Sequence, residues 1–260
     1  MTTALVTGAS SGIGAEFARQ LADRGTDLVL VARDRERLEE AAARYRAAGR
    51  EVEVLVADLA DRADVDRVAA RLEDASRPVD VLVNNAGFGM HTRLTDPDLR
   101  AHDAAFEVMM RAVLVLGGAA GRAMRARGHG RILNVSSTAA FLTMSSGYSA
   151  VKAWVLNMSE GLANELRGTG VTVTALAPGW VRTEFHSRSG VNRSSIPDVL
   201  WLPVEKLVRT ALRDMDRGKV VSIPSGRYKF LIGLARHIPR RTVRWVSRGL
   251  SSSRSDTVSE

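Results

Sequence analysis

The chain of 260 residues contains no cysteine. This excludes disulfides, thiolate zinc sites, iron–sulfur clusters and a cysteine nucleophile, and it agrees with a reducing compartment. Aromatic residues make up only 5% of the chain, which favours helix-rich layers over an all-β sandwich. No segment approaches the roughly 18 consecutive apolar residues of a membrane span, and the first residues lead into an apolar strand pattern without a basic leader. We therefore expect a cytoplasmic protein whose chemistry depends on oxygen and nitrogen groups.

Acidic residues are scarce near the C-terminus. Residues 201–260 hold 13 Lys/Arg and 5 Asp/Glu, which equals the whole net charge of +8, and the first 200 residues hold 24 of each. We interpret residues 226–260 as a basic amphipathic extension whose end, from Ser251, is disordered. Three interpretations stay open: a packed helix with solvated arginines, a weak contact with an anionic membrane surface, and nucleic-acid binding. The first is favoured, and we expect no specific nucleic-acid partner.

Seven short runs, apolar on both faces, alternate with helical stretches. The predicted strands are Ala4–Thr7, Asp27–Val31, Val52–Val56, Val79–Val83, Arg131–Val135, Val171–Leu176 and Val220–Ile223. Asp61 and Asp64 form a predicted capping box, and Gly25 and Gly49 mark helix ends. The pattern predicts an α/β fold: one doubly wound Rossmann-type domain over residues 1–225, with a mostly parallel sheet flanked by helices. Its ligand site should lie at the carboxyl ends of the strands.

Residues 183–203 have no clear period. They mix Ser, Gly, Asn and Pro with five large apolar residues: Phe185, Ile196, Val199, Leu200 and Trp201. We interpret the segment as a lid with an apolar inner side. His186 lies in it, either as a ligand of the substrate or as a plain loop residue.

A glycine-rich turn follows the first predicted strand and opens a helix. Gly8 permits the tight turn, Gly12 lets the backbone approach a pyrophosphate, and Gly14 allows close packing of the helix. The residues predicted to bind a dinucleotide in this turn are Gly8, Ser10, Ser11, Gly12, Ile13 and Gly14.

The second predicted strand ends on a basic residue, Arg33. A guanidinium pairs with a ribose 2′-phosphate, whereas an acid would bind the 2′-hydroxyl, so Arg33 predicts NADP as the cofactor. The alternative is a solvated arginine beside Asp34. Asp58, after the third strand, contacts the adenine amino group or caps a turn.

Tyr148 and Lys152 are four residues apart in a helical stretch and therefore share a face. Ser137 follows a predicted strand directly, at the edge where the glycine turn would deliver a cofactor. An ammonium beside a tyrosine favours the phenolate, so we expect Lys152 to lower the pKa of Tyr148.

In order and spacing, these motifs resemble the short-chain dehydrogenases/reductases over residues 3–225. The resemblance rests on the segments Thr7–Gly14, Asn84-Asn85-Ala86-Gly87, Ser137, Tyr148-x-x-x-Lys152 and Pro178-Gly179-x-x-x-Thr183. It implies hydride transfer between NAD(P)H and a carbonyl or secondary alcohol, with Tyr148 as general acid/base and Ser137 polarising the substrate oxygen. By it, Lys152 holds the nicotinamide ribose. The remaining cofactor contacts that it implies are Asn85, Ala86, Gly87, Pro178, Gly179, Val181 and Thr183. It also implies a homodimer or homotetramer formed through two long helices.

Met109 departs from the family, which usually places an asparagine there to hold a proton-relay water. The connection from Ser137 to Tyr148 is also about two residues shorter than in similar sequences. Two function classes follow: an NADP(H)-dependent reductase of a small lipophilic carbonyl compound, and a catalytically weak NADP(H)-binding regulatory protein. The five histidines and the Asp58–Asp66 carboxylates lack metal-site spacing, so we expect no metal.

Overall fold

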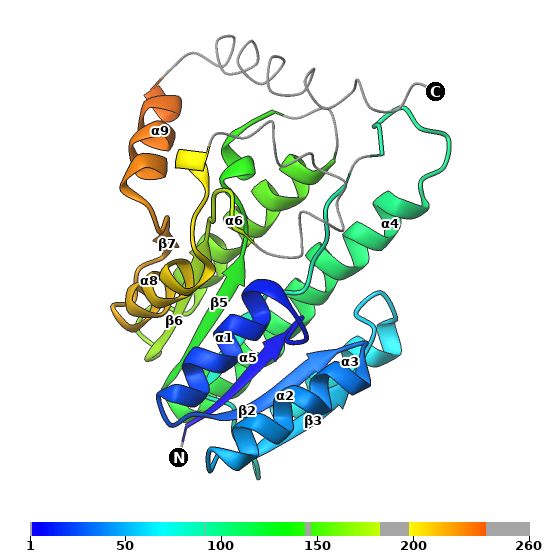
Figure 1. The fold of residues 1–260 in the computed structure, drawn as a ribbon, viewed down its shortest axis with the longest axis vertical. Helices are drawn as coiled ribbons and strands as arrows, with labels where there is room; N and C mark the ends of the chain where they lie inside the picture. Colours follow the sequence, from blue (N-terminus) through cyan, green and yellow to red (C-terminus); the bar gives the residue numbers. More distant parts are fainter. Residues whose placement is uncertain (1, 91, 144–146, 183–197, 238–260) are drawn as a thin grey trace.

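A seven-stranded sheet forms the centre of the computed structural model, which describes residues 2–90, 92–143, 147–182 and 198–237 (Figure 1). The strand order is β3-β2-β1-β4-β5-β6-β7, and all neighbouring strands pair in parallel. The strands are β1 Thr3–Thr7, β2 Asp27–Ala32, β3 Val52–Val56, β4 Val81–Asn84, β5 Gly130–Val135, β6 Val171–Leu176 and β7 Val221–Ser222. The predicted doubly wound fold is confirmed.

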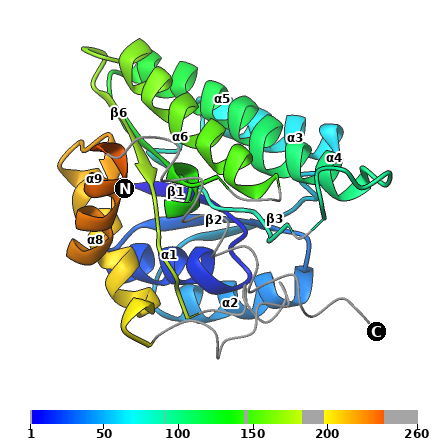
Figure 2. The same cartoon turned by 90° about the horizontal axis from the view of Figure 1, so that it is seen from above.

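Helices cover both faces of the sheet, as continuously apolar parallel strands require. In Figure 2, α1, α2 and α8 lie on one side and α3, α5 and α6 on the other, and each set packs on its own apolar core cluster. The helices are α1 Gly12–Asp23, α2 Arg35–Ala47, α3 Arg62–Glu73, α4 Arg100–Phe106, α5 Ala112–Arg127, α6 Tyr148–Glu165, α8 Val204–Asp216 and α9 Gly226–His237. Shorter turns are the π-helical η1 Glu107–Arg111 and the 3-10 turns η2 Thr138–Phe141 and η4 Asp198–Leu200.

The predicted helix ends hold, but the capping box does not. Gly25 and Gly49 follow α1 and α2 with φ of 83° and 77°, the left-handed region that glycine adopts without strain. Asp61 caps α3 by accepting a bond from Ala63 N. Asp64, however, accepts from Asp58 N at 2.7 Å and not from the cap residue, because the β3–α3 turn folds back over it.

The fourth strand begins later than predicted, at Val81. The carbonyl of Val79 leaves the ladder and accepts a bond from Arg127 Nη2 at 2.6 Å, while the Asp80 carboxylate accepts from Thr3 N at 3.0 Å. The seventh strand is also shorter than predicted, since only two of its residues pair with β6.

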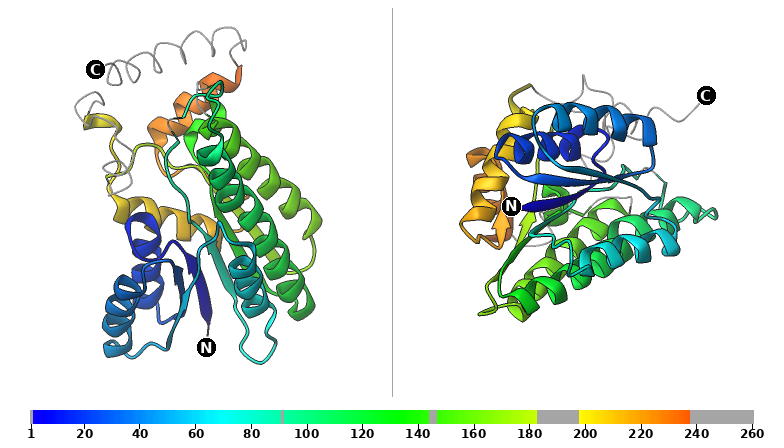
Figure 3. Two further views of the ribbon diagram at one scale, coloured as in Figure 1. Left: turned by 90° about the vertical axis from the view of Figure 1, so that its right-hand side faces the viewer. Right: turned by 90° about the horizontal axis from the view of Figure 1, so that it is seen from below.

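A continuous helix runs from Arg100 to Arg127 through α4, η1 and α5, and it is long and apolar enough to cross a membrane by composition. Half of its most apolar window is buried inside the protein, and it packs against α3, β4 and β5. It therefore forms part of the helical layer on one face of the sheet (Figure 3).

The strand order positions the site. The connection after β1 runs over one face of the sheet and the connection after β4 runs over the other, so the helices that follow these two neighbouring strands lie on opposite faces. Such a switch point leaves a crevice at the carboxyl ends of the strands. The glycine turn after β1 and the Asn85 segment after β4 meet there.

Candidate active site

The glycine turn is held by hydrogen bonds from the segment after β4. The Thr7 hydroxyl accepts bonds from Asn85 N and Ala86 N at 2.9 and 3.1 Å, and Asn85 Nδ2 donates to Thr7 O at 3.0 Å. Gly8 has φ +65°, and a side chain there would press on Asn85 Nδ2. Two segments 78 residues apart are thus locked together.

Gly14 is required by close approach. A Cβ at Gly14 would collide with the carbonyl oxygen of Gly8 and with Asn85 Nδ2. The first turn of α1 therefore lies directly on the glycine turn. Gly12, the first residue of α1, has φ +58°, so its glycine meets a backbone requirement.

The N-terminus of α1 suits an anionic group. Its N-cap residue is Ser11, and within the described residues no side chain caps the helix. Free N–H groups and the positive end of the helix dipole then point into the crevice between β1 and β4. The pyrophosphate of a dinucleotide fits this cradle, whose floor has no side chain at Gly8.

Arg33 stands at the end of β2 with its side chain 77% exposed, and its Nη1 lies 3.8 Å from Asp58 Oδ2. Asp58 Oδ1 accepts a bond from Ala60 N at 3.0 Å, so this carboxylate caps a turn, one of its two predicted roles. Asp34 caps α2 by accepting a bond from Arg37 N. The structure thus brings Arg33 and Asp58 together at one edge of the cofactor crevice.

The Ser137 and Tyr148 side chains interact, with the Ser137 hydroxyl as a hydrogen-bond partner that lowers the pKa of Tyr148. Ser137 follows β5 and caps η2, while Tyr148 is the first residue of α6. Residues 144–146 between them lie outside the described part of the chain. The structure therefore brings together the two hydroxyls that the sequence assigned to one site.

Burial is the main cause of the pKa shifts of Tyr148 and Lys152. It raises the pKa of Tyr148 to about 12, against the opposing effect of the Ser137 hydrogen bond. It lowers the pKa of Lys152 to about 8. Lys152 Nζ lies 5.7 Å from the centre of the Tyr148 ring. The pKa of Tyr148 is therefore raised and not lowered as expected from Lys152, so its hydroxyl is protonated at pH 7.

A buried polar ladder fixes α6 against the sheet, and the sequence analysis missed it. Asn84 Nδ2 donates to Asn134 Oδ1 at 2.9 Å across paired positions of β4 and β5. Asn134 Nδ2 donates to Ser159 Oγ at 3.0 Å on α6. Ser136 Oγ adds a bond to Lys152 O at 2.6 Å. Polar residues inside otherwise apolar strands were the available signal.

The segment after β6 closes the site from the other side. Thr138 N donates to Pro178 O at 2.9 Å, and Val181 is buried and bridges to Leu202. A Cβ at Gly179 would collide with the ring of Tyr228 from α9. Residues 183–197, which include Thr183 and most of the predicted lid, lie outside the described residues.

His102 is a buried group that the sequence analysis did not assign. It is 5% exposed on α4, and its ring edge lies against Gly147, the residue before Tyr148. Within the described ranges neither ring nitrogen has a hydrogen-bond partner, and no cluster of side chains there could hold a metal ion. A buried imidazole without a hydrogen-bond partner lowers the free energy of unfolding, and replacing it should change the stability measurably.

Comparison with known proteins gives the family. The model of the short chain dehydrogenase family matches residues 2–193. The chain belongs to this family. A relative at 37% identity over 183 residues is an uncharacterized oxidoreductase of Staphylococcus saprophyticus, with 69% of this chain and 78% of that protein covered.

Solved structures of short-chain dehydrogenases share the fold. One from Sphingobium yanoikuyae, in complex with NADPH, has a TM-score of 0.83 at 37% identity and covers 92% of this chain and 96% of that one. An alcohol dehydrogenase from Comamonas testosteroni, specific for bulky-bulky ketones, has a TM-score of 0.78 at 33% identity over 92% and 95%. A Burkholderia phymatum structure in complex with NAD has a TM-score of 0.79 at 25% identity over 90% and 92%. This chain therefore has the fold of the nicotinamide-dependent oxidoreductases of this family.

Met109 is the chief departure from the short-chain dehydrogenase pattern. It is 1% exposed on the π-helical turn η1. A Cβ at Gly87 would lie 3.1 Å from Met109 Sδ and 3.7 Å from Lys152 Nζ, so the thioether fills the space beside the ammonium. A thioether is a weak acceptor and no donor. Met109 therefore cannot hold the relay water that the family's asparagine holds.

Proposed function

We propose that the protein is an NADP(H)-dependent oxidoreductase that reduces a lipophilic ketone or oxoacyl compound to a secondary alcohol. The interacting hydroxyls of Ser137 and Tyr148 after β5, with Lys152 one turn further along α6, carry this proposal. It lies at the edge of the sheet where the Gly8 turn and Pro178–Gly179 also end.

The chain's own residues divide the work. When bound, NADPH supplies the hydride that reaches the carbonyl carbon. The Ser137 hydroxyl donates a hydrogen bond to the carbonyl oxygen and stabilises the charge that develops on it. Tyr148 transfers its proton to the same oxygen. Lys152 would hold the ribose on the nicotinamide side of the cofactor, and the residues that would support the nicotinamide end are Asn85, Ala86, Gly87, Pro178, Gly179, Val181 and Thr183.

Replacing Tyr148 by Phe tests the chemistry. We expect Y148F to lower NADPH oxidation with a ketone panel by about 10²- to 10⁴-fold, because the proton donor is lost and its ring remains. Y45F, in a partly buried tyrosine of α2 far along the sheet, is the matched control and should keep full activity. Equal rates for Y148F and the wild type would refute the assignment.

The choice of NADP rests on Arg33 at the end of β2, where the adenosine ribose of a dinucleotide would lie. Its guanidinium is exposed and lies 3.8 Å from the Asp58 carboxylate, so this ion pair is long and solvent-exposed and therefore weak. Arg33 can therefore turn to a 2′-phosphate. The Sphingobium relative was solved with NADPH, which supports this choice, and the Burkholderia relative with NAD shows that the fold accepts both cofactors.

Titrations of both cofactors test this residue. R33A should weaken NADPH binding and leave NADH binding nearly unchanged, since only NADPH carries the 2′-phosphate. The control variant is R50A. Arg50 donates to Gly25 O at the amino ends of β2 and β3, whereas Arg33 lies at the carboxyl end of β2. Equal losses for both cofactors in R33A would reject the contact.

A lipophilic substrate is suggested by the apolar residues beside the site. The rings of Trp180 and Trp201 lie 6.1 Å apart, and Trp201 follows Leu200 in η4. The Comamonas relative, specific for bulky-bulky ketones, supports a large apolar pocket. Reduction rates over a series of aryl alkyl ketones and short hydroxyketones would test the preference, and a faster reaction with the polar series would contradict it.

The second candidate, a regulatory NADP(H)-binding protein, was suggested by Met109. It is not favoured, because the Ser137–Tyr148 bond and Lys152 are all in place.

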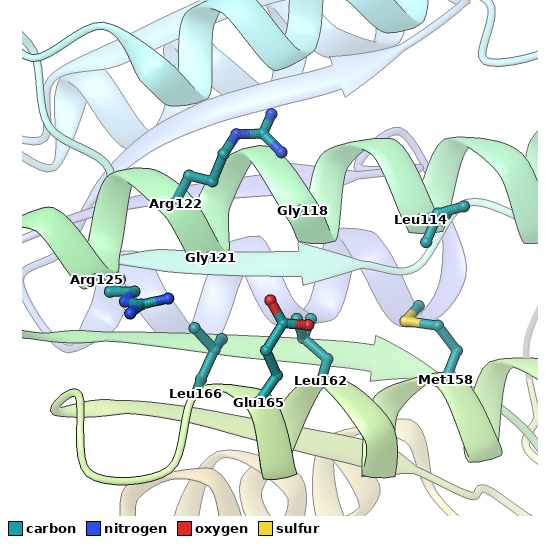
Figure 4. A pocket seen from close by; sticks show the side chains of 9 residues that line it. All are labelled: Leu114, Gly118, Gly121, Arg122, Arg125, Met158, Leu162, Glu165 and Leu166. Atoms are coloured by element: carbon teal, nitrogen blue, oxygen red, sulfur yellow. The ribbon is translucent and has the colours of Figure 1, made fainter.

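We also propose a homodimer, or a tetramer built from it, through α5 and α6. A groove between these helices is lined by Leu114, Gly118, Gly121, Arg122, Arg125, Met158, Leu162, Glu165 and Leu166 (Figure 4). Leu114 is 52% exposed at one end of it. Arginine and glutamate on facing helices make the groove complementary to a second copy. L114D should shift the mass in light scattering to that of a monomer. A cytoplasmic location and the absence of a nucleic-acid partner stay predictions.

A further inference from the structure

The helix α9 is bound to the protein by two residues of one face. Tyr228 and Ile232 are four residues apart and are 8% and 6% exposed. The Tyr228 hydroxyl donates to Leu200 O at 2.8 Å and accepts from Trp180 N at 3.1 Å. The sequence-based interpretation of a packed amphipathic helix is therefore right about the helix, which begins at Gly226.

The large apolar residues of α9 lie elsewhere than that interpretation placed them. Phe230, Leu231 and Leu234 are 72%, 48% and 51% exposed. Phe230 and Leu234 are one turn apart with Leu231 beside them, so the three form a contiguous strip away from Tyr228 and Ile232. Among the described residues Phe230 is the most exposed of the large hydrophobic side chains. A continuous exposed apolar strip marks an interaction surface.

The sequence that carries this strip has charge of one sign. From Arg217 to Ser255 the sequence has ten Lys/Arg and no Asp/Glu. Lys229 is exposed on the helix, and Arg227 lies one turn before Leu231. Apolar residues flanked by cations fit an anionic lipid surface, where the side chains enter the acyl boundary and the cations face lipid phosphates. Nucleic acid would leave the apolar strip without a partner.

The opposite face of α9, which carries Tyr228, lies close to the candidate active site. The helix α9 packs on η2, which follows Ser137, and the Tyr228 ring lies against Gly179 after β6. Figure 1 shows α9, in orange, beside η4 at the outer edge of the molecule.

We propose that α9 docks the protein on anionic bilayers through Phe230, Leu231 and Leu234. Docking there holds α9 against the lipid surface with η2 and the Trp180–Trp201 segment directly behind the helix, so that a lipophilic ketone partitions from the membrane into the site. This second step rests on the function proposed above; the docking itself does not.

Vesicle flotation with the full-length protein tests the docking. Wild-type protein should float with vesicles of phosphatidylcholine containing about 30% phosphatidylglycerol, much less with phosphatidylcholine alone, and less again in about 0.5 M NaCl. The double variant F230S/L234S should bind the anionic vesicles at least about tenfold more weakly. The control L99S changes a leucine that is 53% exposed before α4 and should bind like the wild type.

Four measurements on F230S/L234S decide between the outcomes: the thermal midpoint, the ketone rate, flotation and light scattering. F230S/L234S should keep the thermal midpoint and the rate with a water-soluble ketone, since both side chains are exposed and neither touches the site; a folding failure would show in both. Equal flotation of the variant and the wild type, or no flotation of the wild type, would overturn the proposal. Dissociation of an oligomer by F230S/L234S in light scattering would assign the strip to a second copy instead. Loss of flotation with an intact ketone rate leaves the catalytic proposal standing, and a fully active Y148F removes that proposal without affecting the docking.

Discussion

The Lys152 ammonium donates a hydrogen bond to the Val135 carbonyl oxygen over 3.0 Å. Val135 is the last residue of β5, two positions before Ser137, so this bond fixes the head of the lysine at the strand end that carries the site. The lysine is 5% exposed. A buried ammonium with one carbonyl partner is disfavoured relative to water, which is why its pKa falls to about 8.

This burial predicts a pH-dependent stability. Between the folded pKa of about 8 and the ordinary value of 10.5 the unfolded chain binds more protons, so the free energy of unfolding rises with pH in that window. Relative to K152M, the wild type should gain about 2 kcal/mol between pH 8 and pH 10. Urea denaturation at pH 8, 9 and 10 measures the difference. K206M, at an exposed lysine of α8, should show no such trend relative to the wild type. A flat difference for K152M would contradict the burial argument.

Gly14 should tolerate no side chain. In G14A the new methyl group meets the Gly8 carbonyl oxygen and Asn85 Nδ2, so the turn must open. We expect a loss of about 2–4 kcal/mol of stability and a weaker complex with NADPH, followed by protein fluorescence. Gly161 in α6 offers the control, because a Cβ there meets nothing within 4 Å. G161A should be neutral or more stable by up to about 1 kcal/mol, and similar losses for both variants would argue against a local cause.

Variants at Met109 distinguish a role in packing from an effect on proton resupply. M109N places an amide beside Lys152, where the family keeps one, and should raise turnover if proton resupply limits it. The same change should cost about 1–3 kcal/mol of stability, because a polar group enters the apolar cluster of Met90, Ala105 and Val151. M109L keeps the apolar packing and should leave turnover unchanged. Steady-state rates in light and heavy water measure the effect, and an unchanged M109N rate would mean that another group supplies the proton.

The imidazole of His102 should be replaceable. H102M removes two buried nitrogens that have no hydrogen-bond partner among the described residues and keeps a similar volume, so the free energy of unfolding should rise by about 1 kcal/mol. His129, 62% exposed near Asp80, gives the control H129M, which should change stability very little. Thermal unfolding compares the two. A destabilised H102M would show that the ring has a partner in the protein in solution.

The sequence by itself determined the fold, and it predicted the glycine turn and the Ser137, Tyr148 and Lys152 group that the structure brings to the carboxyl ends of the strands. These follow from local rules: apolar runs of strand length, left-handed glycines such as Gly8 and Gly25, and the one-turn spacing of Tyr148 and Lys152. Such patterns depend on a few neighbouring residues, which a sequence displays directly. The same reasoning predicted the Asp61–Asp64 capping box wrongly, because Asp64 turns to the more distant Asp58 N.

Only the tertiary structure decided the electrostatics and the surfaces. It reversed the expected pKa shift of Tyr148, because desolvation raises that pKa more than the hydrogen-bond partner Ser137 lowers it. It joined Asn134 to Ser159 and left Phe230 of α9 in solvent. Burial and pairing between distant segments depend on how the helices settle on the sheet, and no local pattern carries that information.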